Sequence, residues 1–331
     1  MSEQQQQQPR TFRIGTRKSQ LAMVQTQLVC STLESLYPQH KFEIVAMSTT
    51  GDRILDVALS KIGEKALFTK ELEVALEDGR VDFVVHSLKD LPTTLPAGMY
   101  LGAVMERENP HDALVLSEKH KDATLASLPA GSVIGTSSLR RVAQLKRAYP
   151  HLVFTDVRGN LNTRLAKLDD PSGPYAGIVL AVAGLTRIHL AHRISHILTP
   201  AESLHAVSQG ALGVECREND QVCTDLIDSL NHTNTRLACT SERSLMRTLE
   251  GGCSVPIGVN SALDQQKHTL SLRGLVASLD GQNVVEHESS VALDPSVPLN
   301  QQYHLANQLG VDVANKLIEL GAGAILKELA H

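Results

Sequence analysis

The sequence contains no tryptophan, and aromatic residues make up 3% of its 331 residues. Proteins that bind single-stranded nucleic acid stack bases on aromatic side chains, and nucleic-acid binders generally carry an excess of basic residues. Here 36 acidic residues outnumber 31 basic ones, which gives a formal net charge of -5. The composition therefore argues against a general nucleic-acid-binding protein, and any positive charge that binds a ligand must be local.

Long apolar runs are also missing: none reaches the roughly 20 residues that span a bilayer. The segment from Met1 to Arg10 is rich in glutamine and lacks the apolar core of a secretory signal, so we interpret it as a solvated tail. Cysteine is scarce, odd in number and without a C-x-x-C pair, which is typical of a reducing compartment. These features predict a cytoplasmic protein. The cysteines are Cys30, Cys216, Cys223, Cys239 and Cys253.

Two common nucleotide-binding signatures are absent. No G-x-G-x-x-G follows a predicted strand, and there is no G-x-x-x-x-G-K-[ST]. His189, His192 and His196 have a spacing that could bind zinc if they shared one helix face. No matching cysteine or carboxylate pattern accompanies them, and solvent-exposed helix histidines are more common, so we predict no metal site.

Strands alternate with helices over most of the chain, which predicts a mostly parallel α/β architecture. The pattern restarts near Glu106–Asp112, and the composition changes again from about Asn231. We predict a first α/β lobe from residues 1–107 and 208–230, a second from 108–207, and a smaller α+β domain from 231–331. The two lobes should resemble those of periplasmic binding proteins, with a cleft between them into which the carboxyl ends of the strands open.

The predicted elements can be given by range. Strands are expected at Phe12–Gly15, Lys41–Met47, Val81–Val85, Val133–Gly135, Leu152–Val157 and Ile178–Val182, and an antiparallel pair at Leu270–Ser278 and Asn283–Val291. Helices are expected at 19–37, 69–77, 139–149, 159–169, 239–249 and 301–320.

Arginines recur where a predicted strand gives way to a helix. Helix N-termini carry unpaired N–H groups and partial positive charge, and guanidinium groups bind carboxylates or phosphates in a bidentate way. A single arginine is normally a solvated surface charge, but the repetition favours a ligand with several negative groups. The segments are Arg17-Lys18-Ser19, Gly135-Thr136-Ser137-Ser138-Leu139-Arg140-Arg141, Val157-Arg158-Gly159-Asn160-Leu161-Asn162-Thr163-Arg164 and Gly184-Leu185-Thr186-Arg187.

Asp90 closes a predicted buried strand. A carboxylate there can act as a general acid or base, or can stabilise a cation. A loop aspartate that caps a turn or pairs with Lys89 is the ordinary alternative, and the two interpretations have about equal weight.

Cys253 follows two glycines that suit the end of a helix, and Pro256 keeps Val255 extended. A thiol on such an ordered loop can react. A small buried residue is the usual fate of a free cysteine, and we assign the other four cysteines to that role.

The chain resembles the porphobilinogen deaminase (hydroxymethylbilane synthase) family. The matching stretches occur in family order across residues 12–330. They are Arg17-Lys18-Ser19-Gln20-Leu21-Ala22, His86-Ser87-Leu88-Lys89-Asp90-Leu91-Pro92, Gly135 to Arg141, Val157 to Arg164, Gln209 to Glu215 and Leu249 to Pro256.

The resemblance implies a transferase of tetrapyrrole and haem biosynthesis. Four porphobilinogen molecules are joined head to tail with loss of ammonia, and water releases hydroxymethylbilane. The chain grows on a dipyrromethane cofactor joined by a thioether to a cysteine, which matches Cys253, while the acid of the family motif matches Asp90. Cofactor- and substrate-binding residues would be Arg17, Ser19, Ser87, Lys89, Thr136, Ser137, Ser138, Arg140, Arg141, Arg158, Gly159, Asn160, Arg164, Arg187, Gln209 and Gly210.

The expected partner is the small-molecule substrate porphobilinogen. We expect the protein to be a monomer that binds neither nucleic acid nor membrane. Three departures from the family pattern are minor: the glutamine tail, Ser208 where many members have glycine, and the lack of an insertion found in animal members. A two-lobed cytosolic anion-binding module without catalysis is the main alternative, although it would not need Cys253. A cysteine-nucleophile transferase without a prosthetic group is the second.

Overall fold

The computed structural model describes residues 8–53, 68–249 and 255–328. The chain divides into two compact units, each formed by segments distant in sequence. The first unit comprises Met1–Leu55, Lys65–Arg107 and Ala211–Arg236, and the second comprises Asp56–Glu64, Glu108–Gly210 and Leu237–His331. The division into two lobes and a separate third domain remains a prediction.

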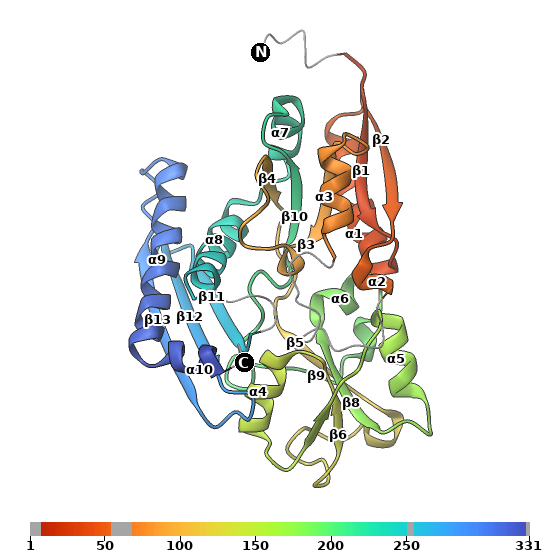
Figure 1. Ribbon diagram of the computed structural model, residues 1–331, viewed down its shortest axis with the longest axis vertical. Helices are drawn as coiled ribbons and strands as arrows, with labels where there is room; N and C mark the ends of the chain where they lie inside the picture. Colours follow the sequence, from red (N-terminus) through yellow and green to blue (C-terminus); the bar gives the residue numbers. More distant parts are fainter. Residues whose placement is uncertain (1–7, 54–67, 250–254, 329–331) are drawn as a thin grey trace. The chain divides into compact units, whose positions relative to one another are not determined.

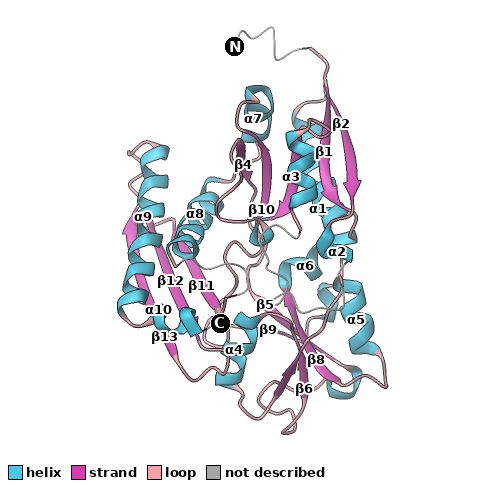
Figure 2. Ribbon diagram, in the orientation of Figure 1, coloured by secondary structure: helices cyan, strands magenta, loops and turns pink. Residues whose placement is uncertain are grey.

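The first unit is built on a five-stranded sheet with strand order β2-β1-β3-β10-β4. β1 is parallel to β2 and β3, whereas β10 is antiparallel to β3 and β4. Four strands therefore run in one direction and β10 is reversed. The elements, coloured by type in Figure 2, are β1 (Thr11–Arg17), α1 (Gln20–Leu36), β2 (Lys41–Met47), α2 (Thr50–Arg53), α3 (Lys70–Glu77), β3 (Phe83–Ser87), η2 (Leu88–Asp90), β4 (Met99–Val104), β10 (Leu212–Arg217) and α7 (Gln221–Asp228).

The helix α1 begins as the sequence predicts. The hydroxyl of Ser19 accepts a hydrogen bond from the backbone N–H of Ala22, which satisfies one of the unpaired donors of the first turn. Val29 and Leu33, one turn apart, are fully buried, and they pack with Phe12 in the main apolar cluster of this unit. The apolar stripe of the helix therefore fixes it against the sheet.

The second unit contains another five-stranded sheet, of order β7-β6-β8-β5-β9. β6 is parallel to β7 and β8, and β5 is antiparallel to β8 and β9, so again a single strand, β5, is reversed. The elements are β5 (Asp112–Leu116), η3 (Glu118–His120), β6 (Val133–Gly135), α4 (Leu139–Ala148), β7 (Val153–Thr155), α5 (Leu161–Asp169), β8 (Tyr175–Ala181), α6 (Val182–Arg187), η4 (Ala191–Arg193) and β9 (His196–Ile197).

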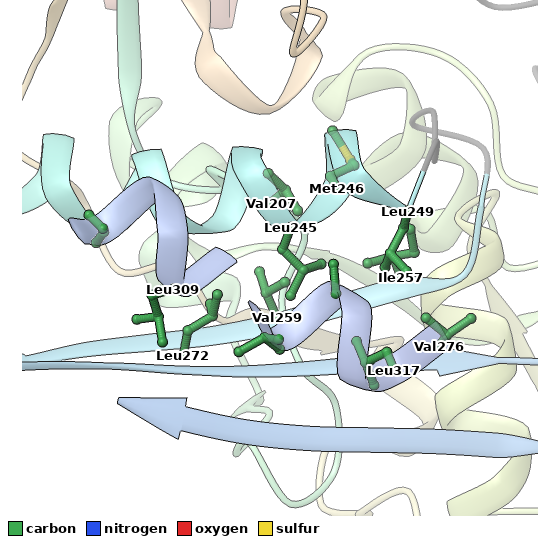
Figure 3. Packing of buried hydrophobic residues seen from close by; sticks show 14 of the residues in the cluster. Val207, Leu245, Met246, Leu249, Ile257, Val259, Leu272, Val276, Leu309 and Leu317 are labelled. Atoms are coloured by element: carbon green, nitrogen blue, oxygen red, sulfur yellow. The ribbon is translucent and has the colours of Figure 1, made fainter. Parts of the chain in front are cut away.

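A three-stranded antiparallel sheet of order β11-β12-β13 completes the second unit. The helix α8 (Thr233–Thr248) leads into it, and α9 and α10 follow it. Leu245 of α8, Leu309 and Leu317 of α9, and Leu272 and Val276 of β12 lie in one buried cluster between the helices and the sheet (Figure 3). The strands and helices are β11 (Ile257–Asp264), β12 (Thr269–Ala277), β13 (Val284–Ala292), α9 (Leu299–Glu319) and α10 (Ala322–Glu328).

The fold class is confirmed: two mixed α/β sheets, each with one reversed strand, and an antiparallel sheet with helices at the carboxyl end (Figure 1). Within the segment 208–230, which the sequence assigns to the first lobe, β10 forms part of the first sheet and lies between β3 and β4. Among the described residues, no helix has both the length and the apolar character needed to cross a membrane.

Candidate functional site

The predicted site residues of the first unit gather where β1 and β3 end. These strands are parallel neighbours, with Gly15 opposite Val84, so Arg17 and Ser87 come at the same edge of the sheet. The guanidinium carbon of Arg17 lies 4.3 Å from the centre of the Phe68 ring, a cation–π contact that holds the arginine in place. A cationic group therefore stands at the carboxyl edge of the sheet.

Two serines at this edge are oriented by α1. Ser19 is the N-cap of the helix and accepts from the N–H of Ala22 at 3.4 Å. The hydroxyl of Ser87 accepts from the side-chain amide of Gln25, which is buried on α1, at 2.9 Å. Both hydroxyls are thus held in defined positions by the helix that follows β1.

Lys89 and Asp90 lie in the short turn η2, directly after β3. Leu88 and Leu91 in and beside this turn are fully buried, and the N–H of Leu88 donates to the carbonyl of Ala211 at 3.0 Å. These anchors leave Lys89 and Asp90 half-buried. A carboxylate so placed remains accessible to a ligand while partly shielded from water, which strengthens its electrostatic effect.

A buried pair that no sequence pattern indicated lies beside this turn. Nε2 of His86, on β3, lies 2.8 Å from Oε2 of Glu215, on β10, and the two side chains are 4% and 0% exposed. Oε1 of Glu215 has no hydrogen-bond partner among the described residues. Burial raises the pKa of Glu73; Thr69 opposes this shift, the charge of Glu215 adds to it, and His86 has a smaller lowering effect. The strand β3, which precedes Asp90, therefore carries one member of a buried titratable pair, and its neighbour β10 carries the other.

In the second unit, three hydroxyl residues connect β6 to α4. The hydroxyl of buried Thr136 accepts from the N–H of Ser138 at 3.3 Å, and that of Ser137 donates to the carbonyl of Val157 at 3.0 Å. Ser138 is the N-cap of α4, yet its side chain accepts no hydrogen bond from the helix. Asn160, the N-cap of α5, does accept one. The first turn of α4 therefore has no side-chain cap, which is a favourable position for a carboxylate.

The start of α5 carries a second group of predicted residues. Oδ1 of Asn160 accepts from the N–H of Thr163 at 2.9 Å. Gly159 has a φ of 110°, a conformation that glycine adopts readily, and its carbonyl accepts from Nε of Arg164 at 2.8 Å. Arg158 precedes α5 and Arg164 lies in its first turns, as the sequence spacing predicts, and both side chains are half-buried.

Arg187 occupies a different position from the one expected. It is the last residue of the short helix α6, not a residue at the beginning of a helix, because the apolar run turns helical at Val182. Its Nη2 donates to the carbonyl of Gly210 at 2.6 Å. Burial lowers the pKa of Arg187, partly offset by the charge of Glu108. Arg187 thus holds the loop that contains Gly210.

Arg140, Arg141 and Gln209 converge on a residue that the sequence analysis did not single out, Asp112. Its side chain is fully buried and makes ion pairs of 2.7 Å with each arginine. Nε2 of Gln209 donates to its Oδ1 at 2.9 Å. Burial alone would raise the pKa of Asp112, but the two guanidinium groups outweigh it and hold this pKa well below its usual range. The carboxylate therefore stays charged inside the protein.

Cys253 lies outside the described residues, between the end of α8 and the start of β11. The cysteines of the described part are free thiols and buried. Burial raises the pKa of Cys30 to about 11, with a contribution from Glu34, and also raises that of Cys216. Such thiols are poor nucleophiles, which agrees with the structural role assigned to them.

The three histidines considered for zinc do not share a helix face. His189 has a φ of 61° in a turn, His192 lies in η4 and His196 in β9. Among the described residues, one group has metal-ligand spacing: Asp82, Asp220 and Cys223. Its carboxylates are already paired with arginines, which accounts for them without a metal. These ion pairs are Arg10–Asp82, Arg13–Asp82, Arg217–Asp82 and Arg217–Asp220.

Comparison with known proteins accounts for nearly the whole chain. The family model described as porphobilinogen deaminase, dipyrromethane cofactor binding domain, matches residues 12–225, and the model of the C-terminal domain matches residues 236–319. The chain belongs to the porphobilinogen deaminase family. Porphobilinogen deaminases from a Synechococcus elongatus strain and a Nostoc strain are 55% and 54% identical to it over 97% of this chain, covering 96% and 95% of theirs.

Solved structures outside the porphobilinogen deaminase family also align with part of the chain. The methionine binding protein MetQ is 14% identical, with a TM-score of 0.42, over 66% of this chain and 89% of that one. The OxyR2 regulatory domain from Vibrio vulnificus is 14% identical, with a TM-score of 0.41, over 70% and 99%.

Proposed function

We propose that this chain catalyses the reaction for which its relatives are named, the deaminating condensation of porphobilinogen. In each addition, the aminomethyl C–N bond breaks and ammonia leaves. The methylene carbon left by ammonia then forms a C–C bond to the free α-carbon of the terminal pyrrole of the growing chain, and that α-carbon loses its proton. After four additions, water releases hydroxymethylbilane. The observation that carries the proposal is identity of 55% to a porphobilinogen deaminase along 97% of the chain.

The donor set of the described residues fits a dipyrromethane cofactor. Each pyrrole ring of such a group carries two carboxylates. The edge at which the parallel strands of each five-stranded sheet end presents guanidinium groups and hydroxyls, and in the second unit it also presents a helix N-terminus without a side-chain cap. When bound, the group supplies the pyrrole α-carbon at which growth starts. We propose that the sulfur of Cys253 holds it as a thioether, because the other cysteines are buried.

For Asp90 we propose a role in proton transfer and charge stabilisation. Loss of ammonia requires a proton on the departing amine and leaves an electron-poor pyrrole. As a carboxylic acid, Asp90 can donate the proton to the departing amine. The carboxylate that remains, half-buried, can then stabilise the electron-poor pyrrole, since low local polarity strengthens its field.

The binding residues are proposed in two groups. Arg17, Ser19, Ser87 and Lys89 would bind carboxylates at the edge of the first sheet. At the edge of the second sheet the group comprises Thr136, Ser137, Ser138, Arg140, Arg141, Arg158, Gly159, Asn160, Arg164, Arg187, Gln209 and Gly210. We further propose that the protein is cytoplasmic, which the free thiols of the described residues support, and that it acts as a monomer.

Intact mass under denaturing conditions tests the attachment. Wild-type protein should exceed the mass of the bare chain by one dipyrromethane, and Cys253→Ser should not. Cys239→Ser is the matched control, because Cys239 is buried on α8 and should leave the added mass in place. Wild-type protein that turns over porphobilinogen at the mass of the bare chain would refute the proposal.

A further inference from the structure

Asp112 occupies the centre of the arginine pair at the edge of the second sheet. It is the first residue of the reversed strand β5 and lies opposite Ala181, the last residue of β8. Because β5 runs against its neighbours, its beginning meets the edge at which β6 and β8 end. A carboxylate from a reversed strand is thereby placed among the predicted binding residues.

The contacts of Asp112 use both of its oxygens. Oδ2 accepts from Nη1 of Arg140 at 2.7 Å. Oδ1 accepts from Nη2 and Nε of Arg141 at 2.7 and 3.0 Å, and from Nε2 of Gln209 at 2.9 Å. The side chains of Asp112, Arg140 and Arg141 are 0%, 5% and 7% exposed. Four residues from three segments are thus joined in one buried network.

The two arginines also donate hydrogen bonds to main-chain carbonyls. Nη1 of Arg140 donates to the carbonyl of Leu204 at 2.6 Å, and Nη1 of Arg141 donates to that of Val179 at 2.7 Å. The two guanidinium groups therefore connect α4 to β5, to β8 and to the segment that precedes Gln209. The buried network of Asp112, Arg140, Arg141 and Gln209 therefore holds these segments together.

The buried network contains more positive than negative charge. Among the described residues, no second acidic side chain forms an ion pair with Arg140 or Arg141, so two cations share one anion. The arginines are also the second and third residues of α4, whose first turn lacks a side-chain cap. A surplus positive charge next to a helix N-terminus attracts a carboxylate.

We propose that Asp112 is a positioning residue for the carboxylate site at the start of α4. By binding both arginines, it fixes the first turn of α4 and the Gln209 segment, and it limits the surplus charge to a single positive unit. The guanidinium groups of Arg140 and Arg141 then remain bound to Asp112 and contribute their surplus positive charge to the site, while the N–H groups at the start of α4 and the neighbouring hydroxyls contact the ligand. This inference rests on the proposed function.

Asp112→Asn tests the proposal in the full-length protein. The expected result is a smaller fraction of molecules with the added dipyrromethane mass and, in the loaded fraction, a KM for porphobilinogen at least tenfold higher, with a smaller change in kcat. Asp169→Asn is the matched control, because Asp169 pairs with Arg193 on the surface of the same unit. The control should keep wild-type loading and KM.

A compensating variant separates charge placement from general stability. Residues 112 and 209 are joined by a hydrogen bond of 2.9 Å. Gln209→Glu in the Asp112→Asn background therefore restores one carboxylate to the network, at position 209 in place of position 112. This double variant should recover loading and lower KM at least threefold relative to Asp112→Asn, and it provides the comparison with wild type if Asp112→Asn alone does not fold. Gln209→Glu alone should show reduced loading and a raised KM, since it places two carboxylates together.

Two results would overturn the role of Asp112: a wild-type KM in loaded Asp112→Asn, or a double variant that does not fold or improves neither loading nor KM. Failure of the proposed function looks different, because wild-type protein would then lack both the added mass and turnover of porphobilinogen.

Discussion

Gly310→Ala gives a sharp test of how α9 packs on α8. Gly310 lies in the middle of α9 and faces α8. A Cβ at this position would come 2.2 Å from the carbonyl oxygen of Ser241, 2.7 Å from Cβ of Ser244 and 2.8 Å from the backbone nitrogen of Leu245. Backbone atoms cannot turn aside as a flexible side chain can, so the helices must separate.

The size of the effect follows from two opposing terms. Non-bonded atoms prefer about 3.5–4.0 Å, so the helices must move apart by roughly 1 Å, and such overpacking costs about 1–3 kcal/mol or more. Alanine gains about 1 kcal/mol over glycine in a helix. We expect a net loss of about 1–2 kcal/mol, and each kcal/mol lowers the melting temperature by about 2–4 °C in a domain of 150–250 residues.

Gly323→Ala in α10 is the control, because a Cβ added to Gly323 would have no heavy atom within 4 Å. It should leave stability unchanged or raise it by up to about 1 kcal/mol. Thermal and urea unfolding of both variants measure the difference. A Gly310→Ala protein as stable as Gly323→Ala would refute the close contact of α8 with α9.

Three further predictions concern ionisable groups. Asp90→Asn should keep the added dipyrromethane mass but lower kcat about 10²–10⁴-fold, because an amide cannot transfer the proton; a rate within a few-fold of wild type would remove Asp90 from that role. Glu215→Leu should cost about 1–3 kcal/mol in urea unfolding by leaving His86 without its buried partner, and unchanged stability would contradict this. The depressed pKa of Asp112 means that its stabilising effect is complete above its unfolded pKa and is lost as the pH falls through the folded pKa. The stability difference between wild type and Asp112→Asn should thus be constant at about pH 6–8 and shrink below about pH 4, and a difference that grows in acid would count against the ion pair.

Local chemistry explains why much of the fold could be predicted from the sequence. The strand Lys41–Met47 and the N-cap Ser19 were predicted at the residues where they occur. Apolar periodicity and capping depend on neighbours a few residues apart, which the sequence displays directly. Arg187 was wrongly expected at the beginning of a helix. A strand and a short buried helix share one apolar pattern, and tertiary packing selects between them.

The sequence by itself determined the alternation of strands and helices, the placement of Asp90 after β3 and the arginines at the junctions, because each depends on residues adjacent in the chain. Only the tertiary structure decided which charges meet. Asp112 lies 28 residues before Arg140 and 97 before Gln209, and Glu215 lies 129 residues beyond His86. Each pair comes together because a reversed strand, β5 or β10, carries one partner into a sheet whose other strands run the opposite way, and no local pattern encodes that arrangement.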